Sequence, residues 1–158
     1  MNTRRVVLAL GVALAPWLGV AGVAGQGKDA KLPAEVLKIL ENADQIEVAS
    51  VDPGNDKIGY KELGSTVVKD AAKRKQIREA LNRSVAEGKD PAKCFEPRHI
   101  IRASSAGKSV NMVICFECSR IHMTVGNQKE YTVIPISSHA ETLLNQILKD
   151  AGVPLAPK

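Results

Sequence analysis

The sequence predicts an α+β domain, a two-layer sandwich in which a mainly antiparallel sheet carries about three helices on one face, preceded by an N-terminal signal segment. Apolar residues recur at helical spacing in separate segments, and they alternate in short runs between those segments. Short loops join the alternating runs, which favours antiparallel pairing. A chain of 158 residues, 44% of them hydrophobic, has the size and composition of one globular domain.

Residues 1–25 predict a signal peptide. Arg4 and Arg5 form a positive region, an apolar run follows, and small residues come next, so we expect cleavage near Ala24 or Gly25. The paired arginines fit both the general secretory route and the twin-arginine route, and the sequence leaves that choice open.

Residues 26–32 are polar for the most part and predict a linker, which leaves 33–158 as a single α+β domain. The protein is therefore expected to be exported, either periplasmic or secreted. It would touch a membrane only through a signal segment that stays uncleaved. An exported protein meets an oxidising environment, in which paired cysteines form disulfides by default.

Helical periodicity predicts the three helices. Pro33 suits the first helical turn, and Asp70 is a good N-cap for the second helix. Ser138 and Glu141 have the spacing of a capping box, which would open the third helix. The expected helices span 33–43, 70–87 and 138–152. The stripe that the second helix turns to the core consists of Ile77, Leu81 and Val85.

Alternation and turn residues predict the strands, which are expected at 45–52, 60–63 with 66–68, 98–103, 109–118, 120–125 and 130–136. In the long strand 109–118, side chains two apart share a face. The more apolar set should face the helices, and it comprises Val110, Met112, Ile114, Phe116 and Cys118. Cys115 should then lie on the opposite face.

Charge and aromatic content limit the classes of partner. The formal net charge is +5, and only 3% of the residues are aromatic. The charge is too small and too dispersed for a nucleic-acid-binding surface, and the chain has too few aromatic side chains for a base-stacking platform. We therefore expect no nucleic-acid partner.

The three cysteines lie between residues 94 and 118. In extended chain the Cα atoms of Cys115 and Cys118 are about 10 Å apart, too far for a disulfide unless the strand ends before Cys118. We therefore expect Cys94 to bond to Cys115 or to Cys118. The preferred bond joins Cys94 to Cys115, because Cys115 lies on the less apolar face of the strand, which a loop can reach. It would close a loop of 22 residues and add about 3 kcal/mol to stability in the chain-entropy model.

A metal-binding or thiol-dependent protein, which would use the cysteines and the nearby histidines, is an alternative interpretation of the same stretch. Thiol and imidazole ligands suit zinc or copper, although their spacing matches no standard zinc module. The candidate ligands are Cys94, Cys115, Cys118, His99 and His122. Apart from this alternative, no cofactor is expected.

A cysteine-dependent hydrolase is a weaker alternative. Cys115 would act with His122 or His99, and an arginine would bind an anion. No glycine-rich elbow or other local signature supports it. The residues held as a possible site are Arg98, His99, Arg102 and His122.

Three motifs resemble a group of uncharacterised exported bacterial proteins. They are Cys-Phe-x-Pro-Arg-His-x-Ile-Arg from Cys94, Ile-Cys-Phe-Glu-Cys from Ile114, and Leu-x-x-Ala-Gly-Val-Pro-Leu-Ala-Pro from Leu148. The resemblance covers the C-terminal half of the chain and implies that this half characterises the group. It implies no activity. The sequence as a whole favours a non-enzymatic exported domain that binds a protein or small ligand at the cell envelope.

Overall fold

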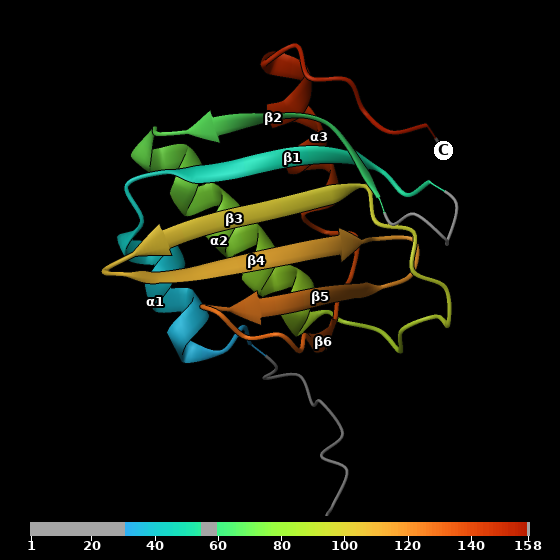
Figure 1. Ribbon diagram of the computed structural model, residues 1–158, viewed down its shortest axis with the longest axis horizontal. Coiled ribbons are helices and arrows are strands. Elements are labelled where there is room, and N and C mark those ends of the chain that lie inside the picture. Colours follow the sequence, from blue (N-terminus) through green and yellow to red (C-terminus); the bar gives the residue numbers. More distant parts are fainter. Residues whose placement is uncertain (1–30, 55–59, 158) are drawn as a thin grey trace, which may run out of the picture.

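The computed structural model describes residues 31–54 and 60–157, so the predicted signal peptide lies outside the described residues. These residues form an α+β fold (Figure 1). No helix among them is long and apolar enough to cross a membrane. The elements are α1 (Ala34–Asn42), β1 (Ile46–Asp52), β2 (Lys61–Val68), α2 (Ala71–Ala86), β3 (His99–Ser105), β4 (Lys108–Cys115), β5 (Arg120–Val125), β6 (Thr132–Pro135) and α3 (Glu141–Asp150).

The strands form one antiparallel sheet in the order β2-β1-β3-β4-β5-β6. Figure 1 shows the three helices behind the sheet, on one face of it. The two-layer α+β prediction is therefore confirmed. A two-residue turn at Ala106 and Gly107 joins β3 to β4, and both residues have positive φ, as this tight hairpin turn requires.

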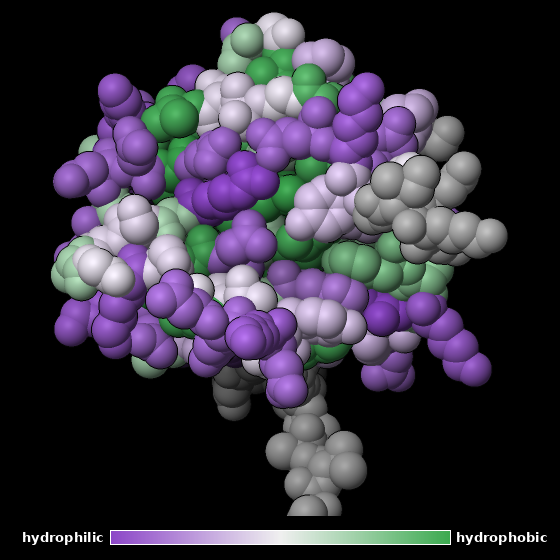
Figure 2. Space-filling model, in the orientation of Figure 1, coloured by the Kyte–Doolittle hydropathy of each residue, from purple (hydrophilic) through white to green (hydrophobic). Residues whose placement is uncertain are grey.

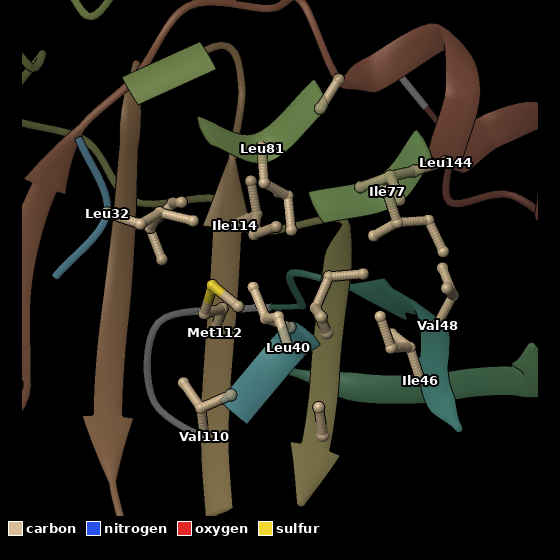
Figure 3. Packing of buried hydrophobic residues seen from close by; sticks show 14 of the residues in the cluster. Leu32, Leu40, Ile46, Val48, Ile77, Leu81, Val110, Met112, Ile114 and Leu144 are labelled. Carbon is tan, nitrogen blue, oxygen red and sulfur yellow. The ribbon is translucent and has the colours of Figure 1, made fainter. Parts of the chain in front are cut away.

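The main core lies between the sheet and the helices (Figure 3). Val110, Met112 and Ile114 of β4 all face it, as their alternation predicts. The stripe Ile77, Leu81 and Val85 of α2 covers them from the helix layer. Leu32, assigned above to the linker, also packs in this core. Its amide donates a hydrogen bond to Asn82 of α2.

The helix ends show one correct and one incorrect prediction. Asp70 caps α2, because its carboxylate accepts a 2.8 Å hydrogen bond from the amide of Lys73. The capping box predicted for α3 is wrong. This helix begins at Glu141. Its N-cap residue is Ala140, and no side-chain capping hydrogen bond forms there. The amide of Ala140 donates instead to Oγ of Ser84 on α2, at 2.9 Å.

None of the described helices covers the second face of the sheet, and Figure 2 shows mainly hydrophilic side chains there, with hydrophobic ones between them. The loop between α2 and β3 crosses one end of this face. Phe95 from that loop packs on a small apolar cluster of Ala49, Val51, Ile100 and Val113. The fold thus holds the loop that carries Cys94 against the sheet.

Candidate functional site

The three cysteines meet at one end of β4. Cys115 is the last residue of that strand, Cys118 lies in the turn that follows, and Cys94 lies in the loop before β3. The disulfide joins Cys115 to Cys118, whose Cα atoms are 5.2 Å apart, and Cys94 is a free, exposed thiol. The predicted bond between Cys94 and Cys115 is therefore wrong.

The physical reason is the length of β4. The sequence predicts a strand that continues to Cys118, but the strand ends at Cys115, and the chain turns through 116–119. Ser119 has a φ of 53°, in the left-handed region, and its amide donates to the carbonyl of Phe116 at 3.0 Å. The turn folds Cys118 back toward Cys115, so the alternation argument does not apply beyond residue 115.

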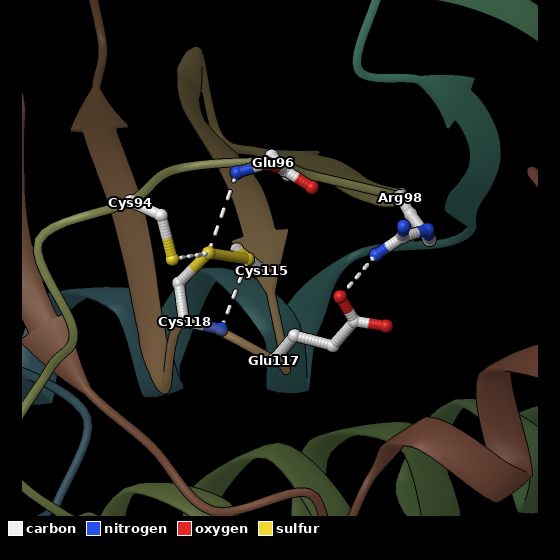
Figure 4. Close-up of a disulfide and its surroundings, with 6 residues drawn as sticks. All are labelled: Cys94, Glu96, Arg98, Cys115, Glu117 and Cys118. Atoms are coloured by element: carbon white, nitrogen blue, oxygen red, sulfur yellow. Dashed lines mark hydrogen bonds and ion pairs between the residues drawn. A yellow bond between two sulfur atoms is a disulfide. The ribbon is translucent and has the colours of Figure 1, made fainter. Parts of the chain in front are cut away.

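Cys94 lies against this disulfide. Its sulfur is 3.2 Å from the sulfur of Cys118, and in Figure 4 the sulfur of Cys118 lies between those of Cys94 and Cys115. The loop is fixed here by a 3.0 Å hydrogen bond from the amide of Ala92 to the carbonyl of Cys118. A free thiol and a disulfide are therefore in contact within one small, tethered cluster.

Backbone amides point at the two bonded sulfurs. The amide of Glu96 donates to the sulfur of Cys118 at 3.3 Å, and the amide of Cys118 donates to the sulfur of Cys115 at 3.1 Å (Figure 4). Both bonded cysteines are buried, at 1% exposure. Amides that face a buried sulfur favour its thiolate form over the thiol when the disulfide opens.

Three stacked rings lie on the second face of the sheet, the face against which the Cys94 loop packs. His122 of β5 lies between the rings of Phe95 and Tyr131, with ring centroids 3.5 Å and 4.0 Å away. Its partial burial lowers the pKa of His122, and the positive charge of Arg120 lowers that pKa further. His122 therefore packs as a neutral stacked ring beside Phe95, the neighbour of Cys94.

His99 lies on the opposite face of the sheet, toward α3. It is buried, and its Nε2 donates to the side-chain oxygen of Asn145 at 2.9 Å, while its Nδ1 has no partner within the described residues. Burial lowers the pKa of His99, and the hydrogen bond to Asn145 offsets this only in part. The adjoining cavity, about 50 Å³, is lined by Arg98, His99, Asn145 and both residues of the turn between Cys115 and Cys118.

The four residues predicted as one site are divided between the two faces. Arg98 and His99 line the cavity near α3, where Arg98 pairs with Glu117 at 2.9 Å. Arg102 lies across the sheet from them and pairs with two glutamates, at 3.2 Å and 2.8 Å. The four residues of the possible site are therefore not brought together, because alternation along β3 sends Arg102 and His99 to opposite faces.

The sequence left two alternative roles for the cysteines open, a metal site and a hydrolase nucleophile. Within the described residues no three histidine, cysteine or acidic side chains come together as a metal site. The nucleophile of the hydrolase alternative, Cys115, is held in a disulfide and so lacks a free thiol. The sequence prediction missed that the sulfur of Cys118 contacts the sulfurs of both other cysteines. The only signal for Cys118 in the sequence was the Cys-x-x-Cys spacing itself.

Acid is expected to destabilise the domain through His99. The folded state holds this side chain neutral, with a pKa below the ordinary value of 6.5, so only the unfolded chain takes up a proton as the pH first falls below that value. The free energy of unfolding should therefore be highest above about pH 6.5 and decline below it. Urea denaturation of the native protein and of His99→Gln, at several pH values, measures this decline.

The His99→Gln variant should lose less stability on acidification than the native protein. It should retain the part of the decline that comes from His122, whose pKa is lowered as well. His139→Gln, which removes an exposed histidine, serves as the control and should leave the decline in place. An equal decline in the native protein and in His99→Gln would contradict this assignment.

Comparison with known proteins finds no family model, no curated protein and no solved structure that matches this chain.

Proposed function

We propose that this protein carries out thiol–disulfide exchange, with Cys94 as the accessible thiol and the Cys115–Cys118 bond as the buried disulfide. The observation that carries the proposal is the 3.2 Å separation between the sulfurs of Cys94 and Cys118. Exchange proceeds by attack of a thiolate on one sulfur of a disulfide. Here the attacking sulfur and the attacked sulfur are already in contact.

The internal step moves the disulfide without any net oxidation. The thiolate of Cys94 attacks the sulfur of Cys118, the bond between Cys94 and Cys118 forms, and the bond from Cys118 to Cys115 breaks. Cys115 leaves as a thiolate, which the amide of Cys118 already faces. The disulfide then includes Cys94, an exposed residue.

That rearranged disulfide can react with a dithiol partner. A partner thiolate attacks the sulfur of Cys94, forms a mixed disulfide and releases Cys118 as a thiolate. The second partner thiol then displaces Cys94, so the partner loses two electrons and two protons, and the protein gains them as thiols. The reverse sequence reduces a partner disulfide. The partner class is therefore a protein or small molecule that carries cysteine thiols.

A purely structural role for the bond is the competing view. The disulfide closes a loop of only four residues, for which the chain-entropy model gives about 2 kcal/mol. Those residues already form a hydrogen-bonded turn between β4 and β5. The bond therefore restricts little that the hairpin leaves free, whereas its contact with a free thiol supports exchange. The export predicted from residues 1–25 would place it where disulfides persist.

The test is to trap the rearranged disulfide. With Cys115→Ser, the remaining pair should form a bond between Cys94 and Cys118, because their sulfurs are already in contact. Peptide mapping by mass spectrometry without reductant identifies the bond. With the matched variant Cys94→Ser, the bond between Cys115 and Cys118 should be found instead.

Two results would overturn the proposal. One is a Cys115→Ser protein that keeps Cys94 and Cys118 as free thiols under an oxidising glutathione buffer. The other is a native protein whose disulfide reacts with reduced glutathione no faster than that of Cys94→Ser. Exchange through Cys94 requires the native disulfide to react faster, since the other two sulfurs are buried.

A further inference from the structure

Arg120 carries a polar atom that finds no hydrogen-bond partner among the residues that the structure describes. It is the first residue of β5, and its Nε is buried with no hydrogen-bond partner in the described part of the chain. No carboxylate of the described residues forms an ion pair with it. A buried guanidinium donor without an acceptor is costly, so its position calls for an explanation.

The sheet places Arg120 next to Cys115. The two residues are directly opposed across the β4–β5 ladder. Opposed residues of an antiparallel pair turn their side chains to the same face, with Cβ atoms about 5 Å apart. On this face Arg120 also lies near Phe95, with Cζ 6.0 Å from the ring centroid. The side chain of Arg120 therefore lies beside that of Cys115, on the face where Phe95 packs.

The other charged groups around Cys115 are accounted for. Arg98 is paired with Glu117 at 2.9 Å, so neither offers a free charge. Glu96 contributes its amide, which donates to the sulfur of Cys118. His122 follows two residues after Arg120 on β5. It is a stacked ring, and its lowered pKa keeps it neutral at ordinary pH. Arg120 is thus a positive charge directly opposite Cys115 that has no ion-pair partner among the described residues.

We infer that Arg120 stabilises the Cys115 thiolate that the internal exchange releases, an inference that rests on the proposed function. While Cys115 and Cys118 are bonded, both sulfurs are neutral, and Arg120 has no ion-pair partner among residues 31–54 and 60–157. When Cys94 displaces Cys115, a negative charge forms beside the unpaired guanidinium. The donor that lacks an acceptor in the present structure finds one in the rearranged disulfide, and this favours the rearranged form.

The experiment measures which thiol is free. Native protein and variants are equilibrated at about pH 9 and about pH 5, on either side of an ordinary thiol pKa. Exchange is stopped with acid, and the free thiol is alkylated in denaturant and located by mass spectrometry. In Arg120→Gln the ratio of free Cys115 to free Cys94 should fall about tenfold at the alkaline pH, where the thiolate forms, and little at the acidic pH.

Controls separate charge from packing. Arg120→Lys keeps the charge and should retain the native ratio within about threefold. Arg83→Gln makes the same substitution at an exposed position on α2 and should leave the ratio of free Cys115 to free Cys94 unchanged. Arg120→Met, which keeps an apolar stem near Phe95, replaces the glutamine variant if that variant does not fold.

An unchanged alkaline ratio in Arg120→Gln would overturn the inference while leaving the proposed function intact. So would an equal fall in Arg120→Lys, because that result would mean that the shape of the guanidinium matters and its charge does not. Absence of any native molecule with free Cys115, together with failure to trap the rearranged bond in Cys115→Ser, would instead overturn the proposed function.

Discussion

Replacing Cys118 with alanine is expected to abolish every intramolecular disulfide and leave Cys94 and Cys115 as two free thiols. Cys118 is the sulfur common to both pairs, being bonded to Cys115 and 3.2 Å from Cys94. Alanine introduces no new polar group at residue 118, which is buried. Reduced glutathione should then find no protein disulfide to react with. The free energy of unfolding should fall by about 2 kcal/mol, because the four-residue loop is no longer closed.

Thiol titration in denaturant and intact mass measure this result on the oxidised monomer. The matched control is Cys94→Ala, which should keep the bond between Cys115 and Cys118 and show no free thiol. A Cys118→Ala monomer with no free thiol would mean that Cys94 and Cys115 can bond. That finding would restore the pairing predicted from the sequence and count against the arrangement described here.

Leu81→Ala should have the largest effect on stability, a loss of about 2–5 kcal/mol in the free energy of unfolding. Leu81 is 1% exposed and belongs to the main core. Figure 3 shows it on α2, directed toward the strand that carries Ile114. Truncation removes buried apolar area and leaves a cavity that the two surrounding layers can close only in part. Urea denaturation followed by circular dichroism measures the loss.

Leu63→Ala is the matched control for this experiment. Leu63 lies on β2, the edge strand, and is partly exposed. The same substitution there should cost no more than about 1 kcal/mol, because less apolar area is lost and solvent fills the space. Similar losses at both positions would contradict the layer arrangement that places Leu81 in the core.

The architecture holds the three cysteines together in the arrangement that the proposed exchange requires. The hairpin between β4 and β5 holds Cys115, Cys118 and Arg120 on a rigid sheet. Cys94 arrives on a loop that Phe95 anchors to the second face. The proposed exchange requires a held disulfide and a tethered but exposed thiol, and the hydrogen bond from Ala92 to Cys118 holds the loop of Cys94 against the turn of Cys118.

Much of the fold was determined by the sequence alone. Helical spacing located the stripe Ile77, Leu81 and Val85, and alternation placed Val110, Met112 and Ile114 on the helix side of the sheet. These patterns predict correctly because the period of side-chain direction is a local property of a helix or strand. Asp70 was identified as an N-cap for the same reason, since its hydrogen bond spans only three residues.

The site was decided by the tertiary structure. The end of β4 is fixed by pairing with β5, which puts Cys115 opposite Arg120, and the turn that follows brings Cys118 back to Cys115. Neither that boundary nor the contact of Cys94 with Cys118, 24 residues apart, is encoded in a local period. Disulfide pairing depends on distances between sulfurs, and those distances exist only after the hairpin closes and the Cys94 loop packs on the sheet.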